Sequence, residues 1–317
     1  MRNFTSVNDV TDMDGLIAKA LAYKAHPYKD KTLGQNKRIG LLFFNPSMRT
    51  RLSTQIAARN LGMDSIVLNV GQEGWSLEFD EDVIMNGSTV EHIKDAAPVL
   101  GKYFDILGVR TFPSLKNKAA DYSEDYLNQF IKYSGVPIVS LESATLHPLQ
   151  SFADLITLHE SIPVSRKPKI VLTWAPHVKA LPQCVANSFA QWMNAWGGAD
   201  FFITHPQGFD LDKSFTAGAI ITSDQDVALQ DADFVYVKNW SSLQNYGITP
   251  EALPQWMPTQ KKLLATNKAK VMHCLPVRRN VELGAEVLDG PLSLVTQQAA
   301  NRVWAAQTVL SEILKTL

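Results

Sequence analysis

Residues 43–51 read FFNPSMRTR and connect an apolar run to an amphipathic segment. The run RIGLLFF, residues 38–44, has the composition of a buried parallel strand, and LSTQIAARNLG, residues 52–62, has the period of a helix. In doubly wound sheets, ligands bind where a strand ends and a helix begins, because the helix N-terminus presents N–H groups that have no partner within the helix. A hydroxyl and two arginines at this turn therefore predict a local anion site.

Composition excludes several classes of protein. With 317 residues, two domains of about 150 residues each are expected. The formal net charge is -1, so no overall field attracts nucleic acid or an anionic membrane. Cys184 and Cys274 are too few for a disulfide framework and lack the spacing of zinc ligands. The sequence shows no signal peptide and no run of about 18 apolar residues, so we expect a cytoplasmic protein without a metal or a membrane partner.

Short apolar runs alternate with segments of helical period, as is typical of parallel strands covered by helices on both faces. The predicted strands are residues 38–44, 64–70, 104–111, 136–143, 167–176, 199–206, 233–240 and 269–277. We predict an α/β fold with two doubly wound parallel-sheet domains joined by helices. The first domain is residues 1–147 and the second is 148–296, and a helix at 297–317 packs back on the first. One joining helix begins at Pro148, since proline suits the first helical position.

The helix after the NPS turn has two possible interpretations. We expect Met48, Leu52 and Ile56 to form its buried stripe, which places Arg49 and Thr50 in the first turn. Backbone donors and the helix dipole favour a phosphate there, and an arginine fork would complete the site. The alternative is a serine N-cap followed by solvated arginines. This motif alone favours neither interpretation.

Three further polar residues lie at a predicted strand end or helix start. Arg110 ends the strand DILGVRT, and His147 and Gln150 share one helix face at i and i+3. Each also has an ordinary structural interpretation, as a surface arginine or as part of a capped helix start. The functional interpretation depends on these residues converging.

The order of the motifs resembles that of the aspartate/ornithine carbamoyltransferase family. The matching motifs are SMRTR at 47–51, GVR at 108–110, HPLQ at 147–150, HCLP at 273–276 and NR at 301–302. This resemblance runs along essentially the whole chain. It implies transfer of the carbamoyl group of carbamoyl phosphate to an amine, a step of arginine biosynthesis, without a metal or an organic cofactor.

The resemblance also implies roles for individual residues. The implied carbamoyl phosphate-binding residues are Ser47, Met48 through its backbone, Arg49, Thr50, Trp75, Arg110, His147, Gln150, Leu275 and Arg302. The implied catalytic residues are Arg49, Thr50, Arg110, His147, Gln150, Cys274 and Arg302. In this scheme Gln150 and the Leu275 backbone hold the carbamoyl nitrogen, and Cys274 orients the attacking amine.

The motif HCLP with Cys274 resembles the ornithine branch, but the SMG loop of ordinary ornithine enzymes is missing, and residues 237–243 read VKNWSSL in its place. The motifs EGW at 73–75, TWAPH at 173–177 and KNW at 238–240 resemble the N-acylornithine carbamoyltransferases. The residues implied to bind an N-acylornithine are Val90, Glu142, His177, Lys238, Cys274, Leu275 and Arg278.

The identity of the acyl group depends on one position. Relatives of the acetyl type place a glutamate in the loop before the EH pair, whereas this chain has Val90 before Glu91. N-succinyl-L-ornithine is therefore favoured as substrate. A register shifted by one residue would place Glu91 in the pocket wall and favour N-acetyl-L-ornithine. A second alternative is a catalytically silent small-anion binding protein of the same fold.

The resemblance implies an assembly and an unusual chain path. The resemblance implies that Trp75 is donated to the active site of a neighbouring subunit, and therefore that the protein is a homotrimer. The alternative interpretation of Trp75 is a partly buried aromatic side chain in a loop. The segment WAPHVKALPQ, residues 174–183, is similar to a proline-rich loop through which this branch threads its second domain. The resemblance therefore implies a knotted loop, a feature that is otherwise rare.

Overall fold

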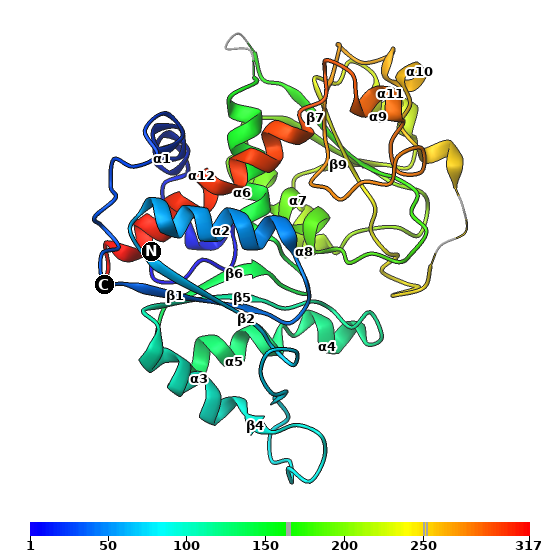
Figure 1. The fold of residues 1–317 in the computed structure, drawn as a ribbon. Coiled ribbons are helices and arrows are strands. Elements are labelled where there is room, and N and C mark those ends of the chain that lie inside the picture. The colour runs from blue at the N-terminus through cyan, green and yellow to red at the C-terminus, as the bar shows by residue number, and fades with distance from the viewer. Residues whose placement is uncertain (163–165, 250, 252) are drawn as a thin grey trace. The chain divides into compact units, whose positions relative to one another are not determined.

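The computed structural model describes residues 1–162, 166–249, 251 and 253–317, and its chain divides into two compact units (Figure 1). Unit 1 comprises residues 1–114, 119–149 and 302–317. Unit 2 comprises residues 115–118 and 150–301. Two helices, α6 (Pro148–His159) and α12 (Val295–Leu314), pass from one unit into the other.

Unit 1 is built on a parallel four-stranded sheet with the order β2-β1-β5-β6. Its strands are β1 (Arg38–Phe43), β2 (Asp64–Asn69), β5 (Ile106–Arg110) and β6 (Ile138–Glu142). All four were predicted from their apolar runs, and the predictions are confirmed. The register pairs Phe43 with Arg110 and Arg110 with Glu142, so the carboxyl ends of three strands lie side by side.

Helices cover both faces of this sheet, with α2 on one face and α3 and α5 on the other (Figure 1). The helices that begin in unit 1 include α1 (Met13–Ala25), α2 (Met48–Asn60), α3 (Ile93–Tyr103) and α5 (Asp125–Tyr133). A buried cluster that includes Leu107, Ile93 and Phe130 joins the sheet to α3 and α5. The short strands β3 (Leu77–Glu78) and β4 (Glu91–His92) pair in parallel and were not predicted.

The expected buried stripe of α2 was wrong. Met48, Leu52 and Ile56 are 68%, 52% and 47% exposed. The buried face consists instead of Thr50, Ser53, Thr54, Ala57, Ala58 and Asn60. Small side chains allow close packing of the helix on its neighbours, whereas the three large apolar side chains form an exposed face.

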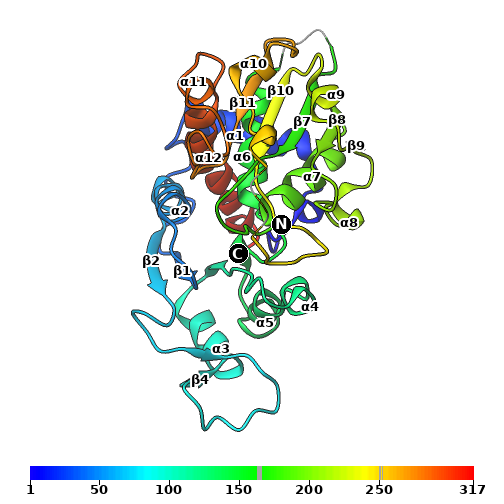
Figure 2. The ribbon, with the colours of Figure 1, turned by 90° about the vertical axis from the view of Figure 1, so that its right-hand side faces the viewer.

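Unit 2 is built on a parallel five-stranded sheet with the order β11-β10-β7-β8-β9, whose strands lie side by side in Figure 2. Its strands are β7 (Lys169–Trp174), β8 (Asp200–Thr204), β9 (Ile220–Thr222), β10 (Phe234–Lys238) and β11 (Lys270–Met272). Four of these were predicted. The edge strand β9 was not, because it is three residues long and exposes both isoleucines, so it lacks a buried apolar run.

The remaining helices are short, apart from α7, and connect the strands. They are α4 (Lys118–Tyr122), α7 (Cys184–Trp196), α8 (Lys213–Thr216), α9 (Gln225–Leu229), α10 (Gln260–Leu263) and α11 (Ala285–Leu288), with 3₁₀ turns at Val7–Asp9 and Pro254–Trp256. Helices α6 and α12 begin close to the predicted positions, Pro148 and residue 297. Within the described ranges, no helix combines the length and the apolar character needed to cross a membrane.

Candidate active site

The turn between β1 and α2 is held by its own serine and by an arginine from β5. Ser47 is the N-cap of α2, and its Oγ accepts a hydrogen bond from the Thr50 backbone N–H at 3.3 Å. Arg110 donates through Nη1 to the carbonyl oxygens of Asn45 and Pro46, each at 3.1 Å. The capping interpretation of the serine is therefore correct, and the turn is fixed against the neighbouring strand.

Arg110 also belongs to a buried ionic cluster. Its Nη2 donates to Glu142 Oε2 at 2.5 Å, and His147 Nε2 lies 3.6 Å from the same oxygen. The strand register causes this arrangement, because it pairs Arg110 with Glu142 at the ends of β5 and β6. Glu142, predicted to bind an N-acylornithine, thus lies in unit 1 beside the residues predicted to polarise the carbonyl group.

His147 is neutral in this cluster. Burial lowers the pKa of His147 to about 3, and the positive charges of Arg302 and Arg110 act in the same direction. The Glu142 carboxylate acts in the opposite direction but does not outweigh them. A neutral imidazole supplies one N–H donor without carrying a charge of its own. Its Nδ1 has no hydrogen-bond partner among the residues the structure describes.

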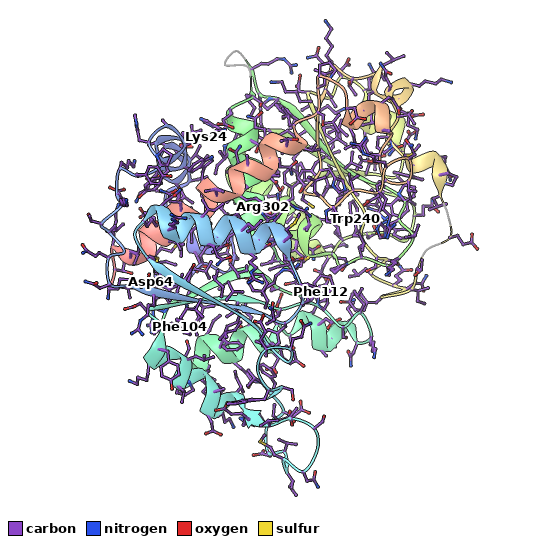
Figure 3. The ribbon with its side chains drawn as sticks, viewed as in Figure 1. Lys24, Asp64, Phe104, Phe112, Trp240 and Arg302 are labelled. Atoms are coloured by element: carbon purple, nitrogen blue, oxygen red, sulfur yellow. The ribbon has the colours of Figure 1, made fainter. Side chains whose placement is uncertain are left out.

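The C-terminal helix brings a second arginine to α2. Arg302 on α12 donates through Nη2 to Thr50 Oγ1 at 2.5 Å, and Figure 3 shows Arg302 beside α2. A second bond between the same helices joins Asn60 Nδ2 to Gln307 Oε1 at 2.9 Å. Residues about 250 positions apart in the chain are therefore in direct contact.

The unit 1 residues provide many donors and few acceptors. The Nε atoms of Arg49 and Arg110 are buried and have no hydrogen-bond partner in the described part of the chain. An unsatisfied buried N–H costs about 1–3 kcal/mol, so such groups are retained where a ligand accepts from them. Because guanidinium groups match phosphate oxygens in geometry and charge, the arrangement suits a phosphate.

Gln150, Cys274 and Leu275 lie in unit 2. Gln150 donates through Nε2 to Asp154 Oδ1 at 2.7 Å. Cys274 is buried just after β11. Leu275 has a φ of 56°, in the left-handed region that side chains other than glycine rarely adopt, and its N–H donates to His273 Nδ1 at 2.9 Å. Because the Leu275 N–H is used in this bond, the backbone group of Leu275 that a ligand could contact is the carbonyl oxygen.

The predicted cations of unit 2 lie with a neutral histidine. Arg278 donates through Nε to His177 Nε2 at 3.2 Å, and Nδ1 of the same ring lies 3.0 Å from the Lys179 backbone nitrogen and 2.9 Å from the Lys179 carbonyl oxygen. Burial lowers the pKa of His177, and Lys238 and Arg278 lower it further against the opposing effects of the Lys179 carbonyl and Glu282. Lys238 itself is buried at the end of β10.

Glu282 is a site residue that sequence reasoning missed. Its Oε2 accepts from the Arg278 backbone N–H at 2.7 Å, and its Oε1 lies 3.5 Å from His273 Nε2. Burial alone would raise the pKa of Glu282, but interaction with His273, the Lys238 charge and the Arg278 N–H lower it to about 2. A single glutamate after RRN has no motif of its own, so only the fold reveals this counter-ion.

Trp75 and Val90 belong to one paired segment of unit 1. The Val90 N–H donates to the Ser76 carbonyl at 3.0 Å, and Trp75 Nε1 donates to Glu91 Oε2 at 2.6 Å. The strands β3 and β4 pair immediately beside them. The two side chains are 58% and 63% exposed, so neither is part of the core of the chain itself.

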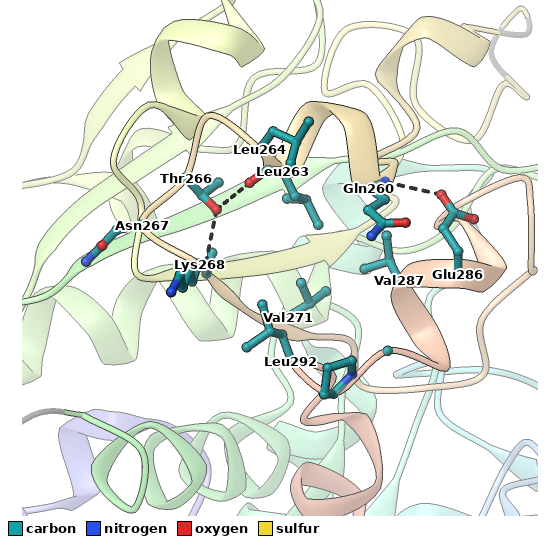
Figure 4. A pocket seen from close by; sticks show the side chains of 13 residues that line it. Gln260, Leu263, Leu264, Thr266, Asn267, Lys268, Val271, Glu286, Val287 and Leu292 are labelled. Carbon is teal, nitrogen blue, oxygen red and sulfur yellow. Dashed lines mark hydrogen bonds between the residues drawn. The ribbon is translucent and has the colours of Figure 1, made fainter.

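A cavity of about 530 Å³ lies elsewhere in unit 2, and Figure 4 shows the side chains that line it. Its walls come from α10, α11 and the start of β11, with Leu263, Leu264 and Val287 among them. None of the predicted site residues lines it. In the described ranges, no group of three histidine, cysteine or acidic side chains is placed to hold a metal ion.

Comparison with known proteins identifies the family. Residues 2–160 match the carbamoyl-P binding domain of the aspartate/ornithine carbamoyltransferases, and residues 183–313 match their Asp/Orn binding domain. The chain belongs to this carbamoyltransferase family. The predicted family and the predicted α/β fold are both confirmed.

Individual relatives within the family are similar over their full length. The chain is 47% identical to the N-succinylornithine carbamoyltransferase of Bacteroides fragilis strain 638R, with 100% of each chain covered. It is 33% identical to the N-acetylornithine carbamoyltransferase of Xanthomonas campestris pv. campestris, with 99% of this chain and 98% of the relative covered.

A solved structure in the family is similarly close. It is a variant of N-acetyl-L-ornithine transcarbamylase in which valine replaces one glutamate, complexed with carbamyl phosphate and N-succinyl-L-norvaline. The TM-score is 0.90 at 33% identity, and the match covers 99% of this chain and 100% of that one.

The lowered pKa of His147 predicts a pH dependence of folding stability. Its folded pKa lies below its unfolded value, so the stabilisation is complete above about pH 6.5 and is lost as the pH falls toward 3. Between pH 7.5 and 5.5 the unfolded chain gains nearly one proton at this residue, which costs about 1 kcal/mol. The parent should therefore lose more free energy of unfolding between these pH values than His147→Gln, which has no titrating group at this position. Urea unfolding of both proteins at pH 7.5 and 5.5 measures the difference. An identical pH dependence in parent and variant would contradict the assignment.

Proposed function

We propose that the chain transfers the carbamoyl group of carbamoyl phosphate to the side-chain amine of N-succinyl-L-ornithine, giving N-succinyl-L-citrulline and phosphate for arginine biosynthesis. The observation that carries the proposal is the buried cluster of Thr50, Arg110, His147 and Arg302 next to the N-terminus of α2. A silent anion-binding protein would need donors for a phosphate, but not a neutral imidazole beside them.

In this proposal unit 1 binds carbamoyl phosphate, the role predicted for residues 1–147 with the C-terminal helix. Arg49 and Arg110, with the first-turn N–H groups of α2 and the Ser47 hydroxyl, hold the phosphate. The Thr50 hydroxyl accepts from Arg302, so its own hydrogen is directed to another acceptor. Thr50 and His147 then donate to the carbonyl oxygen, where negative charge develops in the transition state.

In the same proposal unit 2 binds the N-acylornithine, the role predicted for residues 148–296. Lys238 and Arg278 bind carboxylates of the substrate, with His177 beside them, and Cys274 orients the amine. The amine lone pair attacks the carbonyl carbon, the bond from that carbon to the phosphate oxygen breaks, and phosphate leaves with the proton given up by the amine. Gln150 Oε1 and the Leu275 carbonyl accept from the carbamoyl N–H groups.

The succinyl preference is proposed from the exposed valine at position 90. Glu91 is engaged by Trp75, whereas the Val90 side chain is 63% exposed and uncharged. An apolar wall tolerates a second carboxylate, whereas a glutamate would repel it. The relative with 47% identity is named for N-succinylornithine, and the valine variant of the acetyl enzyme was solved with N-succinyl-L-norvaline.

We further propose a homotrimer in which Trp75 is donated to a neighbouring site, and Val90 reaches the same site because the two share one paired segment. The exposed apolar side chains of Met48, Leu52 and Ile56 suit a contact between subunits. A cytoplasmic location is proposed with it, since two cysteines cannot form a disulfide framework.

A knotted loop at 174–183 is also proposed. Its support is the hydrogen bonding between this loop and the segment after β10. Trp174 Nε1 donates to the Trp240 carbonyl at 2.9 Å, and the Ser241 N–H donates to the Leu181 carbonyl at 2.8 Å.

Arg49→Ala tests the phosphate assignment. Loss of a charge-assisted contact to a desolvated phosphate should cost about 2–5 kcal/mol of transition-state stabilisation. Product formation from N-succinyl-L-ornithine should fall by orders of magnitude while the circular dichroism spectrum stays unchanged. Arg51→Ala, two residues along and exposed, is the matched control and should retain activity. Near-normal turnover of the Arg49 variant would refute the assignment.

Val90→Glu tests the acyl group. A like charge near the succinyl carboxylate should cost roughly 1–4 kcal/mol at an intermediate dielectric, so kcat/KM for N-succinyl-L-ornithine should fall. Use of N-acetyl-L-ornithine should be spared or improved. Under the alternative register, Glu91→Ala would change the preference and Val90→Glu would have little effect. Measuring both substrates on the parent and both variants decides between them, and a parent that prefers the acetyl compound contradicts the proposal.

Mixing inactive variants tests the donation of Trp75. Chains with Arg49→Ala and chains with Trp75→Ala should regain activity when they are mixed and allowed to reassemble, because some hybrid sites then carry neither defect. Mixing Arg49→Ala with Arg110→Ala is the control, since both residues belong to one chain's unit 1 and no intact site forms. A fully active monomer in sedimentation would rule out the shared site.

A further inference from the structure

Asp154 lies at the centre of a buried polar network in unit 2. It sits on α6 one turn after Gln150, and its side chain is completely buried. Gln150 Nε2 donates to Asp154 Oδ1 at 2.7 Å, and Gln298 Nε2, from α12, donates to the same oxygen at 2.7 Å. None of the motifs in the sequence included Asp154 or Gln298.

The carboxylate determines which way both amides point. Both glutamines turn their NH₂ groups toward Asp154 Oδ1, which accepts from each of them, so the carbonyl oxygen of each amide points away from that oxygen. For Gln298 the result is visible, because its Oε1 accepts from the His273 backbone N–H at 2.9 Å. For Gln150 the same constraint turns an acceptor, Oε1, away from Asp154.

The network also reaches the cysteine. Tyr236 is buried near the Asp154 carboxylate and the Cys274 thiol, but its hydroxyl has no hydrogen-bond partner among the described residues. Burial, together with these two neighbours, raises the pKa of Tyr236 well above its usual value, so the phenol keeps its proton. Asp154 is thus linked to the Cys274 turn through Gln298 and the His273 backbone N–H.

We propose that Asp154 is a positioning residue that presents Gln150 Oε1 to the carbamoyl nitrogen and, through Gln298, holds the His273–Cys274 strand end that orients the amine. This inference rests on the proposed function, because the carbamoyl N–H groups are donors and need an acceptor. A Gln150 side chain turned the other way would place its NH₂ against another NH₂.

The need for a fixed amide orientation explains a fully buried acid at this position. A buried carboxylate is costly unless hydrogen bonds satisfy it, and here two amide N–H groups converge on one oxygen. An asparagine would offer both an acceptor and a donor, so it would permit either orientation of the neighbouring amides. Only an acceptor without hydrogens imposes one arrangement on both glutamines.

A double-mutant cycle tests the inference. Asp154→Ala and Gln150→Ala should each lower kcat by about 100-fold. If Asp154 acts through Gln150, removing Asp154 from the Gln150→Ala chain should cost less than about tenfold more, whereas independent effects would multiply to about 10,000-fold. Asp154→Asn keeps the side-chain volume and one acceptor, so its kcat should fall less than that of Asp154→Ala. If the alanine variant does not fold, Asp154→Asn replaces it in the double-mutant cycle with Gln150→Ala.

Asp233→Ala is the matched control for lost packing. Asp233 is also a buried acid of unit 2, where it accepts from the Lys169 N–H and from Asn267 Nδ2 at 2.9 and 2.8 Å. Its removal should lower the melting temperature and change kcat by the same factor whether or not Gln150 is present. Equal factors for Asp154 in both backgrounds would overturn the inference.

A second readout separates this inference from the proposed function. Inorganic phosphate should raise the melting temperature of Asp154→Ala as much as that of the parent, because the phosphate residues lie in unit 1, and it should not stabilise Arg49→Ala. A parent that forms no product and is not stabilised by phosphate would refute the proposed function itself. An active parent whose Asp154 and Gln150 effects multiply would refute only the positioning role.

Discussion

The buried guanidinium of Arg110 connects the elements on which the unit 1 site depends. Its two terminal nitrogens bind the turn after β1 and the carboxylate at the end of β6, and the residue itself ends β5. Removing one partner of such a buried pair leaves a charge without compensation, which typically costs 3–5 kcal/mol. The geometry at the start of α2 and around His147 therefore depends on this one side chain and on the strand register that places it beside Glu142.

The two units arrange their buried charges differently. In unit 1, arginines surround a histidine kept neutral, so the region carries fixed donors and net positive character suited to a phosphate and a developing oxyanion. In unit 2, Lys238 and Arg278 lie near the buried carboxylate of Glu282, which accepts from a backbone N–H and faces His273. A buried carboxylate at this depth serves as a counter-ion for the neighbouring cations.

The residues proposed to select the acyl group lie on a segment separate from the main sheet of unit 1. The residues proposed to bind carbamoyl phosphate are presented mainly by strand ends and helix starts, whereas Trp75 and Val90 are on an exposed paired segment. One substitution on this exposed segment can change the side chain that faces the acyl group without disturbing the sheet. Closely similar folds are therefore compatible with different acyl groups. The fold therefore explains the reaction class, and the exposed segment is where substrate choice is expected to lie.

The sequence by itself determined the parallel strands, the order of the five motifs and the start of α6. Buried strands are continuous apolar runs, and motif residues must follow them, so both signals are local. The tertiary structure alone decided which face of α2 is buried, where the edge strand β9 lies, and that Glu282 and Asp154 are buried beside site residues. These features depend on partners distant in the chain. An isolated carboxylate, a short exposed strand or a face of small side chains has no periodic pattern, and acquires its role only through contacts made on folding.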